Sequence, residues 1–193
     1  MDGMNKIYIE DKTFDRIDFS AKRLEKGDYD LCRFQQCNFS NSDLSNCSFS
    51  ECSFRDCNMG MVHTANTSFN DVRFIGSKML GIHFELCNEL LFTVYFEHCI
   101  LDLSSFYKRN LKKVIFSHCS LQEVDFTESD LTLALFDHCN LSRAKFEHTI
   151  MEKADLRTSF NFSIDPSINK IKKAKFSLAG LPGLLDRYEL DIS

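Results

Sequence analysis

The sequence predicts an all-β solenoid, a β-helix in which one chain winds repeatedly around a common core. Two observations predict it: an apolar residue recurs at every fifth position, and the residue two places before it is small or β-branched. The 193 residues include 19 Phe, no Trp and 7 Gly, so one aromatic type is used repetitively. Neither the helical period nor the strand period produces a five-residue repeat, which requires a chain that turns at short, regular intervals.

The repeat runs in two series. The first holds Phe14, Phe19, Leu24, Tyr29, Phe34, Phe39, Leu44, Phe49, Phe54, Met59, then Thr64 as its one exception, then Phe69, Phe74, Met79 and Phe84. The second holds Phe96, Leu101, Phe106, Leu111, Phe116, Leu121, Phe126, Leu131, Phe136, Leu141, Phe146, Met151 and Leu156. Between them the phase shifts by two residues at 87–93, so one corner of the coil is expected to bulge. The bulge is either a tolerated surface insertion or a device that presents Phe92 to a partner.

Three segments carry a family resemblance. Cys52-Ser-Phe-Arg-Asp, Ala144-Lys-Phe-Glu-His and Ala154-Asp-Leu-Arg-Thr resemble the pentapeptide-repeat consensus A-(D/N)-L-x-x, and the match extends over about 11–158. The resemblance implies a right-handed quadrilateral β-helix with four pentapeptides per coil, in which the central residue and the one two before it point inward. The strict alternation of Phe and Leu from Phe96 to Leu141 supports the fourfold coil independently.

The C-terminal segment is expected to cap the solenoid. The pattern is lost at Phe160 to Pro166 and returns at Ala174-Lys-Phe-Ser, which predicts a last coil at about 165–177. A short helix is predicted at about 180–188, with Leu181, Leu184, Leu185 and Tyr188 on one side. Because an open β-helix end exposes unpaired strand edges, this helix covers either its own last coil or a second chain. Resemblance to Qnr and MfpA proteins implies a homodimer through this end, in a single domain spanning 1–193.

Composition limits the partners. The formal net charge is −5 and the pI is about 5.7, so direct binding to nucleic acid is not expected. No apolar run is long enough to span a bilayer and no secretory signal pattern is present, which predicts a cytoplasmic protein without membrane attachment. The nine Cys form an odd number, so reduced thiols are expected rather than a disulfide framework.

Neither catalysis nor metal binding is predicted. The cysteines occupy inward positions and are expected to pack as small hydrophobes. His98, His118 and His138 recur at the same place in successive coils and predict a surface ladder, since rings about 4.8 Å apart do not converge on one metal ion. No nucleophile elbow, phosphate loop or zinc-protease motif occurs, and a filled solenoid has no substrate cavity. We therefore expect a non-enzymatic protein without a cofactor.

Two surface features suggest a protein partner. Tyr95, Ile115 and Leu135 each precede a central residue by one and form an apolar stripe, which either binds a partner or is covered by an end segment. The second feature is acidic: 114–142 contains no Lys or Arg but holds Glu123, Asp125, Glu128, Asp130 and Asp137.

Resemblance to the Qnr, MfpA and McbG group, which protects topoisomerases, implies a DNA mimic that binds DNA gyrase or topoisomerase IV and modulates quinolone susceptibility, with consequences for quinolone resistance. The carboxylates fit the basic DNA-binding surface of such a partner. The alternative is a generic protein-protein interaction scaffold with an unrelated partner.

Overall fold

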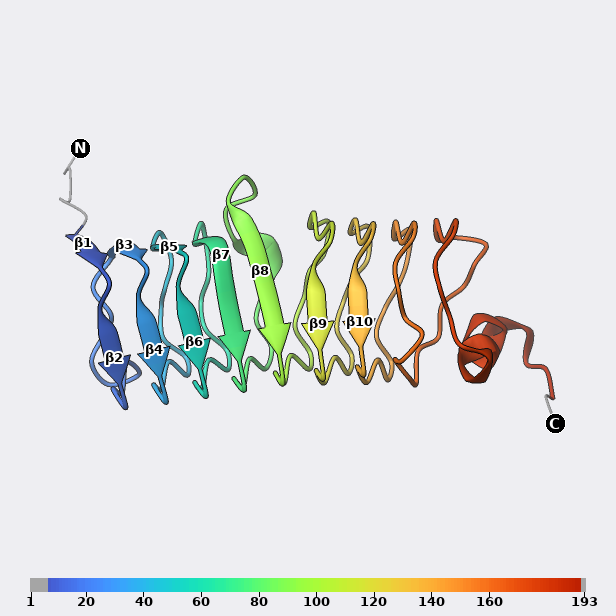
Figure 1. The fold of residues 1–193 in the computed structure, drawn as a ribbon, viewed down its shortest axis with the longest axis horizontal. Helices are drawn as coiled ribbons and strands as arrows, with labels where there is room; N and C mark the ends of the chain where they lie inside the picture. The colour runs from blue at the N-terminus through green and yellow to red at the C-terminus, as the bar shows by residue number, and fades with distance from the viewer. Residues whose placement is uncertain (1–6, 192–193) are drawn as a thin grey trace.

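The chain forms an elongated parallel β-solenoid with its two ends at opposite ends of the rod (Figure 1). The computed structural model describes residues 7–191. Successive coils pair in parallel, and most residues pair with the one twenty places later, as Phe14 pairs with Phe34 and Phe116 with Phe136. The all-β solenoid predicted from the five-residue period is confirmed.

The strands are short because each spans one side of a coil. They are β1 (Ile7–Glu10), β2 (Thr13–Asp15), β3 (Gly27–Asp30), β4 (Arg33–Gln35), β5 (Ser48–Ser50), β6 (Ser53–Arg55), β7 (Ser68–Ile75), β8 (Phe92–Glu97), β9 (Ile115–Ser117) and β10 (Leu135–Asp137). The 3₁₀ helices are η1 (Phe84–Leu86), η2 (Leu178–Leu184) and η3 (Asp186–Tyr188). The other sides of each coil pair through isolated β-bridges, such as Ser120 with Asn140 and Asp130 with Ile150.

The rod has four long faces, which we name by their central residues. Face A carries Phe14, Phe34, Phe54, Phe74, Phe96, Phe116 and Phe136. Face B follows it in the chain, with Phe19, Phe39, Met59, Met79, Leu101, Leu121 and Leu141. Face C carries Leu24, Leu44, Thr64, Phe84, Phe106, Phe126 and Phe146. Face D carries Ile9, Tyr29, Phe49, Phe69, Leu111, Leu131 and Met151.

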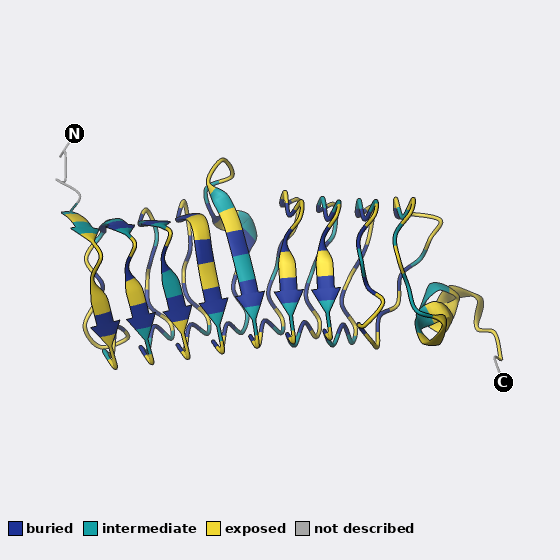
Figure 2. Ribbon diagram, viewed as in Figure 1, coloured by how far each residue is buried: buried dark blue, intermediate teal, exposed yellow. Residues whose placement is uncertain are grey.

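The interior is filled by these central residues and by the small residues two places before them. Buried and exposed residues alternate along the strands of face A (Figure 2). Phenylalanine rings of neighbouring coils stack, as Phe96 does on Phe116 at 5.2 Å between ring centroids, while rings from different faces meet edge to face. All nine cysteines are buried, and burial raises the pKa of the Cys52 and Cys57 thiols to about 12. Cys52 and Cys57 therefore act as packing groups rather than nucleophiles.

The coil turns at the residue two places after the central one. This residue adopts a left-handed backbone in most coils even where it is not glycine, as at His98 (φ 52°), His118 (φ 54°) and His138 (φ 52°). A left-handed non-glycine residue is unfavourable by itself, and it persists here because the β-bridges on both sides fix the backbone. Side chains at equivalent turns are consequently stacked in rows along the rod edges.

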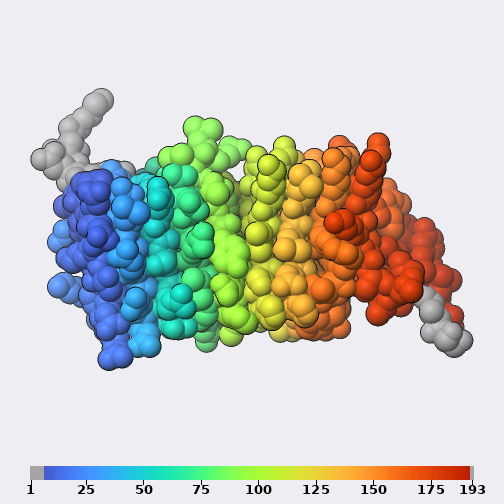
Figure 3. All heavy atoms as spheres, in the orientation of Figure 1, coloured from blue at the N-terminus to red at the C-terminus, as the bar shows by residue number. Residues whose placement is uncertain are grey.

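The phase shift lies in a loop between η1 and β8. Asn66 still bonds to Leu86 twenty places on, whereas Phe69 pairs with Phe92 and Val72 with Val94. The number of residues that separates paired positions in consecutive coils thus rises from 20 to 23 and then becomes 22. The inserted residues of the loop and an irregularity in β7 account for this change. The loop projects beyond the neighbouring coils (Figure 3).

The short helical segment predicted at about 180–188 is present as two consecutive 3₁₀ helices, η2 and η3. Pro182 lies inside η2 rather than at the start of an α-helix. Gly180, Pro182 and Gly183 all disfavour an α-helix. Gly183 also approaches the preceding coil closely: a Cβ there would lie 2.1 Å from the Phe162 carbonyl oxygen, and Ile164 N–H donates to the Gly183 carbonyl at 2.8 Å. Within residues 7–191, no helix has the length and apolar character needed to cross a membrane.

Candidate partner-binding surface

The apolar stripe lies on face A, in the C-terminal half of the rod. Tyr95 of β8, Ile115 of β9 and Leu135 of β10 occupy equivalent positions and pair directly along the rod. Ile115 and Leu135 are each 36% exposed, and Tyr95 is half-buried. The three side chains thus form one continuous surface row, as the five-residue period predicts.

Charged residues border the stripe at both ends. The Arg73 guanidinium lies 5.9 Å from the centre of the Tyr95 ring, a cation–π distance. At the other end Leu135 bridges to Asp155, whose carboxylate pairs with Arg157 and Lys175 at 2.8 and 3.4 Å. An apolar patch with a polar rim is the arrangement found at protein interfaces.

Phe92 does not join this surface. Its ring is half-buried and packs inward against the rings of Phe69 and Phe84, at 6.4 and 5.8 Å between centroids. The exposed apolar residues of the loop are instead Leu90, at 91%, and Leu91, at 46%. Phe92 is therefore a half-buried residue that packs on core rings, while Leu90 and Leu91 are the apolar side chains that the bulge exposes most.

Arg109 explains how the loop is held, and sequence reasoning missed it. It lies two places before Leu111, in an inward position, and is 5% exposed. Its guanidinium donates to the carbonyls of Cys87 at 3.1 Å and Asn88 at 2.9 Å and lies 4.3 Å from the centre of the Phe92 ring. Burial lowers the pKa of Arg109. The signal was available, since the repeat itself assigns this arginine to the interior.

The five carboxylates of the acidic segment lie on different sides of the rod. Glu123 pairs with Arg143, Glu128 with Lys108 at 3.4 Å, and Asp130 with Lys112 at 3.2 Å. Asp125 accepts a hydrogen bond from the Thr127 backbone at 2.9 Å. A segment without Lys or Arg is thus largely neutralised by cations of neighbouring coils, and the five residues form no common acidic face.

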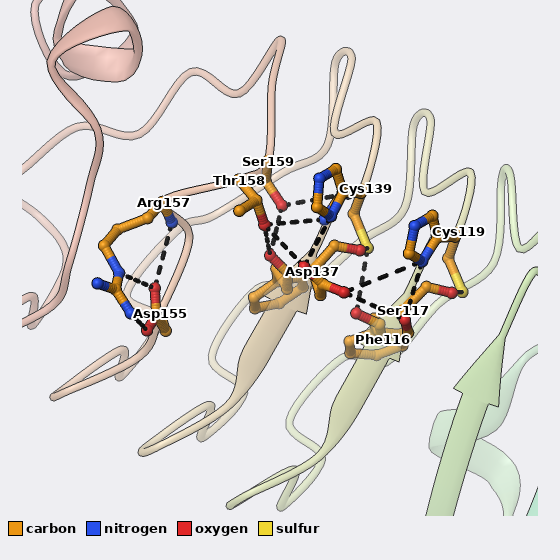
Figure 4. A network of polar contacts seen from close by, with 12 residues as sticks. Phe116, Ser117, Cys119, Asp137, Cys139, Asp155, Arg157, Thr158 and Ser159 are labelled. Atoms are coloured by element: carbon orange, nitrogen blue, oxygen red, sulfur yellow. Dashed lines mark hydrogen bonds and ion pairs between the residues drawn. The ribbon is translucent and has the colours of Figure 1, made fainter.

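Asp137 lies on face A beside the histidine ladder. The ring centroids of His98 and His118, and of His118 and His138, are 4.9 Å apart. Asp137 Oδ1 accepts from His138 Nδ1 at 2.8 Å, and this hydrogen bond lowers the pKa of the Asp137 carboxyl. Asp137 also lies between Ser117 and Thr158, both of which donate to it (Figure 4).

The C-terminal apolar residues divide between core and surface. Leu184 packs against the hydrophobic core. Leu181 is 43%, Leu185 36% and Tyr188 57% exposed. One leucine therefore attaches the segment to the rod, and the other three apolar side chains remain at the surface of the C-terminal end.

Solenoids of this kind, filled and assembled from five-residue units, form a class of repeat proteins whose chemistry lies on their outer faces. The sequence matches two profiles of this class, described as pentapeptide repeat region over 90–160 and pentapeptide repeats (9 copies) over 34–78. The chain belongs to the pentapeptide-repeat family.

Solved structures share the fold at low sequence identity. A trypsin-treated variant of QnrB1, a plasmid-mediated fluoroquinolone resistance protein, is 16% identical, with 97% of this chain and 98% of that chain covered and a TM-score of 0.63. HetL, a pentapeptide repeat protein involved in heterocyst differentiation regulation in the cyanobacterium Nostoc, is 16% identical, with 91% and 86% covered and a TM-score of 0.57. No curated protein matches the sequence. These likenesses concern the fold.

Proposed function

We propose that the protein is a non-enzymatic binding solenoid that holds a protein partner against the apolar stripe on face A. The observation that carries this proposal is the row of Tyr95, Ile115 and Leu135, three exposed or half-exposed apolar side chains in direct register. In the preceding coils the same outward row holds polar or charged residues, such as Ser53 and Arg73. An apolar run in an otherwise polar row is typical of a contact surface.

The filled interior supports binding rather than catalysis. The central residues of consecutive coils contact one another throughout the rod, and the hollows found among residues 7–191 are open at the surface. Arg109, a buried charged residue, donates hydrogen bonds to the backbone of the loop. Nine buried thiols suit a reducing compartment, and we place the protein in the cytoplasm.

The test is a paired substitution on the stripe. Ile115→Ser with Leu135→Ser is expected to weaken binding of the partner captured from the source cell by at least about tenfold, because interface anchors contribute upward of 1–2 kcal/mol each. Leu103→Ser with Leu133→Ser is the matched control, since these leucines are more exposed, at 55% and 46%, but lie on other faces. Equal binding by both variants and the wild type would reject the stripe.

DNA mimicry toward a type II topoisomerase is the second candidate. Its support is the fold shared with QnrB1 and a carboxylate row on the N-terminal half of face D. The outward positions of face D in these coils hold Glu10, Asp11, Asp28, Asp30, Glu51 and Asp71. Within the described part of the chain, none of the outward face D positions from β1 to β7 is Lys or Arg. Asp11 of this row pairs with Arg33 at 2.8 Å. The row nevertheless lies along one face, so it complements a basic DNA-binding surface better than the carboxylates of 114–142, which are spread over different faces.

A supercoiling assay separates this candidate from the scaffold. On this candidate the wild type inhibits DNA gyrase or protects it from ciprofloxacin, and Glu51→Lys with Asp71→Lys abolishes the effect. Glu123→Lys with Glu147→Lys changes the net charge equally on other faces and is expected to retain it. No effect of the wild type on gyrase or topoisomerase IV over a wide concentration range would remove DNA mimicry and leave the scaffold.

A homodimer through the C-terminal end is the third part of the proposal. Leu181 and Tyr188 lie exposed there, next to the hollow lined by Pro182 and Leu185. Light scattering is expected to report twice the chain mass for the wild type and the chain mass for Leu181→Ser with Tyr188→Ser. A monomeric wild type at high concentration would contradict the dimer.

A further inference from the structure

The histidine ladder contains a group of three side chains that converge. His118 and His138 stand one coil apart at the same left-handed turn position, so both rings leave the backbone in the same direction. His138 Nδ1 lies 2.8 Å from Asp137 Oδ1. His118 Nδ1 lies 3.0 Å from the Ser117 hydroxyl oxygen and 3.9 Å from Asp137 Oδ2, so a small rotation of its ring exchanges the serine for the carboxylate. The carboxylate thereby supplies the convergence that two stacked rings alone lack.

The dimensions suit a small divalent ion. Ligand atoms about 2.0–2.1 Å from a tetrahedral zinc ion lie about 3.3 Å from one another. The distances from the two histidine nitrogens to the Asp137 carboxylate, one to each of its oxygens, fall on either side of that value. One ligand atom from each residue can be chosen so that all three lie within 4.8 Å of one another. The side chains of His118, Asp137 and His138 are 47%, 33% and 58% exposed, so small rotations about the side-chain bonds can bring the atoms together.

The carboxylate is already oriented by neighbouring side chains. The Thr158 hydroxyl donates to Oδ1 at 3.1 Å and the Ser117 hydroxyl to Oδ2 at 3.4 Å. Thr158 in turn accepts from the backbone N–H of His138 at 2.9 Å. Hydrogen bonds of this kind to a ligating carboxylate hold it in place and raise metal affinity in known sites.

Cations do not compete for this carboxylate. Neither Lys nor Arg occurs from 114 to 142. On the following coil of face A, the Arg157 guanidinium is engaged by Asp155 through two hydrogen bonds, at 2.9 and 2.8 Å. Among residues 7–191, the ion-pair partners of Asp137 are the two imidazoles, which are themselves potential metal ligands.

We propose that His118, Asp137 and His138 form a surface site for a divalent transition-metal ion, with zinc as the best match to two imidazoles and one carboxylate. Three protein ligands leave a fourth position for water or for a group from another molecule. The ion would link the turn after β9, at His118, to the end of β10 and the turn after it, at Asp137 and His138, and so fasten two consecutive coils. This site is independent of the proposed partner surface, because none of its ligands belongs to the apolar stripe.

Zinc titration of the chelator-treated full-length protein, in a buffer that does not bind metal, tests the site by calorimetry. The wild type is expected to bind one zinc ion with a micromolar dissociation constant. Asp137→Asn, His118→Ala and His138→Ala are each expected to weaken binding by at least about tenfold, the lower end of the effect of even indirect site residues. His148→Ala is the matched control, since His148 is exposed and has the same left-handed turn conformation (φ 53°) but lies on face C.

Cobalt spectra and the variant His98→Ala test further which side chains bind the metal. Co²⁺ bound at this site gives weak visible bands without the strong near-ultraviolet absorption of thiolate ligands. No zinc binding by the wild type, unchanged binding by Asp137→Asn, or thiolate absorption would each overturn the proposal. His98→Ala is expected to bind zinc like the wild type, and a loss equal to that of His138→Ala would also overturn it. Circular dichroism of each variant checks that its fold is retained.

Discussion

Phe116→Ala is expected to lower the free energy of unfolding by about 3–5 kcal/mol, the range for removing a fully buried phenylalanine ring. Phe116 has no exposed surface. Its ring stacks on Phe96 and Phe136, at 5.2 and 5.1 Å, and meets Phe106 and Phe126 edge to face. The cavity would interrupt the face A stack in the middle of the rod. Urea unfolding followed by circular dichroism measures the loss.

Two further alanine substitutions serve as comparisons for the stability loss expected of Phe116→Ala. Phe14→Ala is expected to cost less, because Phe14 lies in an end coil and is 8% exposed. Phe160→Ala, at a ring 49% exposed, is expected to change stability by less than about 1 kcal/mol. In a solenoid each coil contacts only its neighbours, so loss of Phe116 should also separate the unfolding of the two halves. A cost for Phe116→Ala no larger than for Phe160→Ala would contradict the role of the stack.

The five-residue period was sufficient to predict the coil because the same rule acts in every repeat. A central residue such as Phe34 must point inward, and its partners Phe14 and Phe54 must lie twenty places away on both sides. The rule applies to small residues as well, so it placed Cys52 and Cys57 in the interior. A single repeat that departs from the pattern does not change the predicted position of the others, since each coil is aligned by its neighbours.

The repeat rule did not extend to the features that depend on side-chain rotation or on local insertions. It places His118 and His138 in one row, but it does not give the side-chain contacts: the Ser117 hydroxyl meets His118 Nδ1, and the Thr158 hydroxyl of the next coil donates to Asp137. It also assigns Phe92 no position, because the inserted residues break the register there. The C-terminal helices are 3₁₀ rather than α-helical for a related reason: the close approach of Gly183 to Phe162 is a tertiary contact with no periodic signal.

In the acidic segment, 114–142, the order of residues in the sequence likewise did not predict which charges lie next to each other. Glu128 and Asp130 belong to a stretch of sequence without cations, yet Lys108 and Lys112 from the preceding coil reach them. In a solenoid, residues twenty apart are closer neighbours than residues five apart on adjoining faces. The charge of a sequence segment therefore does not predict the charge of a face. The carboxylate row of face D illustrates this, because its members lie in different coils, about twenty residues apart in the sequence.

Arg109→Ala is expected to cost about 2–3 kcal/mol, because it leaves two backbone carbonyls without their donor and opens a cavity against Phe92. Arg109→Met separates the two contributions, since methionine can pack against the Phe92 ring but donates no hydrogen bond to Cys87 or Asn88. Arg143→Ala is the control: its side chain is 78% exposed and its ion pair with Glu123 lies at the surface, so a change below about 1 kcal/mol is expected.

Hydrogen exchange measured by mass spectrometry shows where the Arg109 variants loosen. If the guanidinium holds the loop, both Arg109→Ala and Arg109→Met accelerate exchange at 87–91, while coils distant from it, such as the one containing β4, keep their protection. If the arginine only fills space, Arg109→Met leaves the loop as protected as in the wild type. The Nε atom of Arg109 is buried without a hydrogen-bond partner among the described residues, so this side chain is retained at a cost. A loop that must be fixed in place accounts for that cost, and unaltered exchange at 87–91 in Arg109→Ala would remove the explanation.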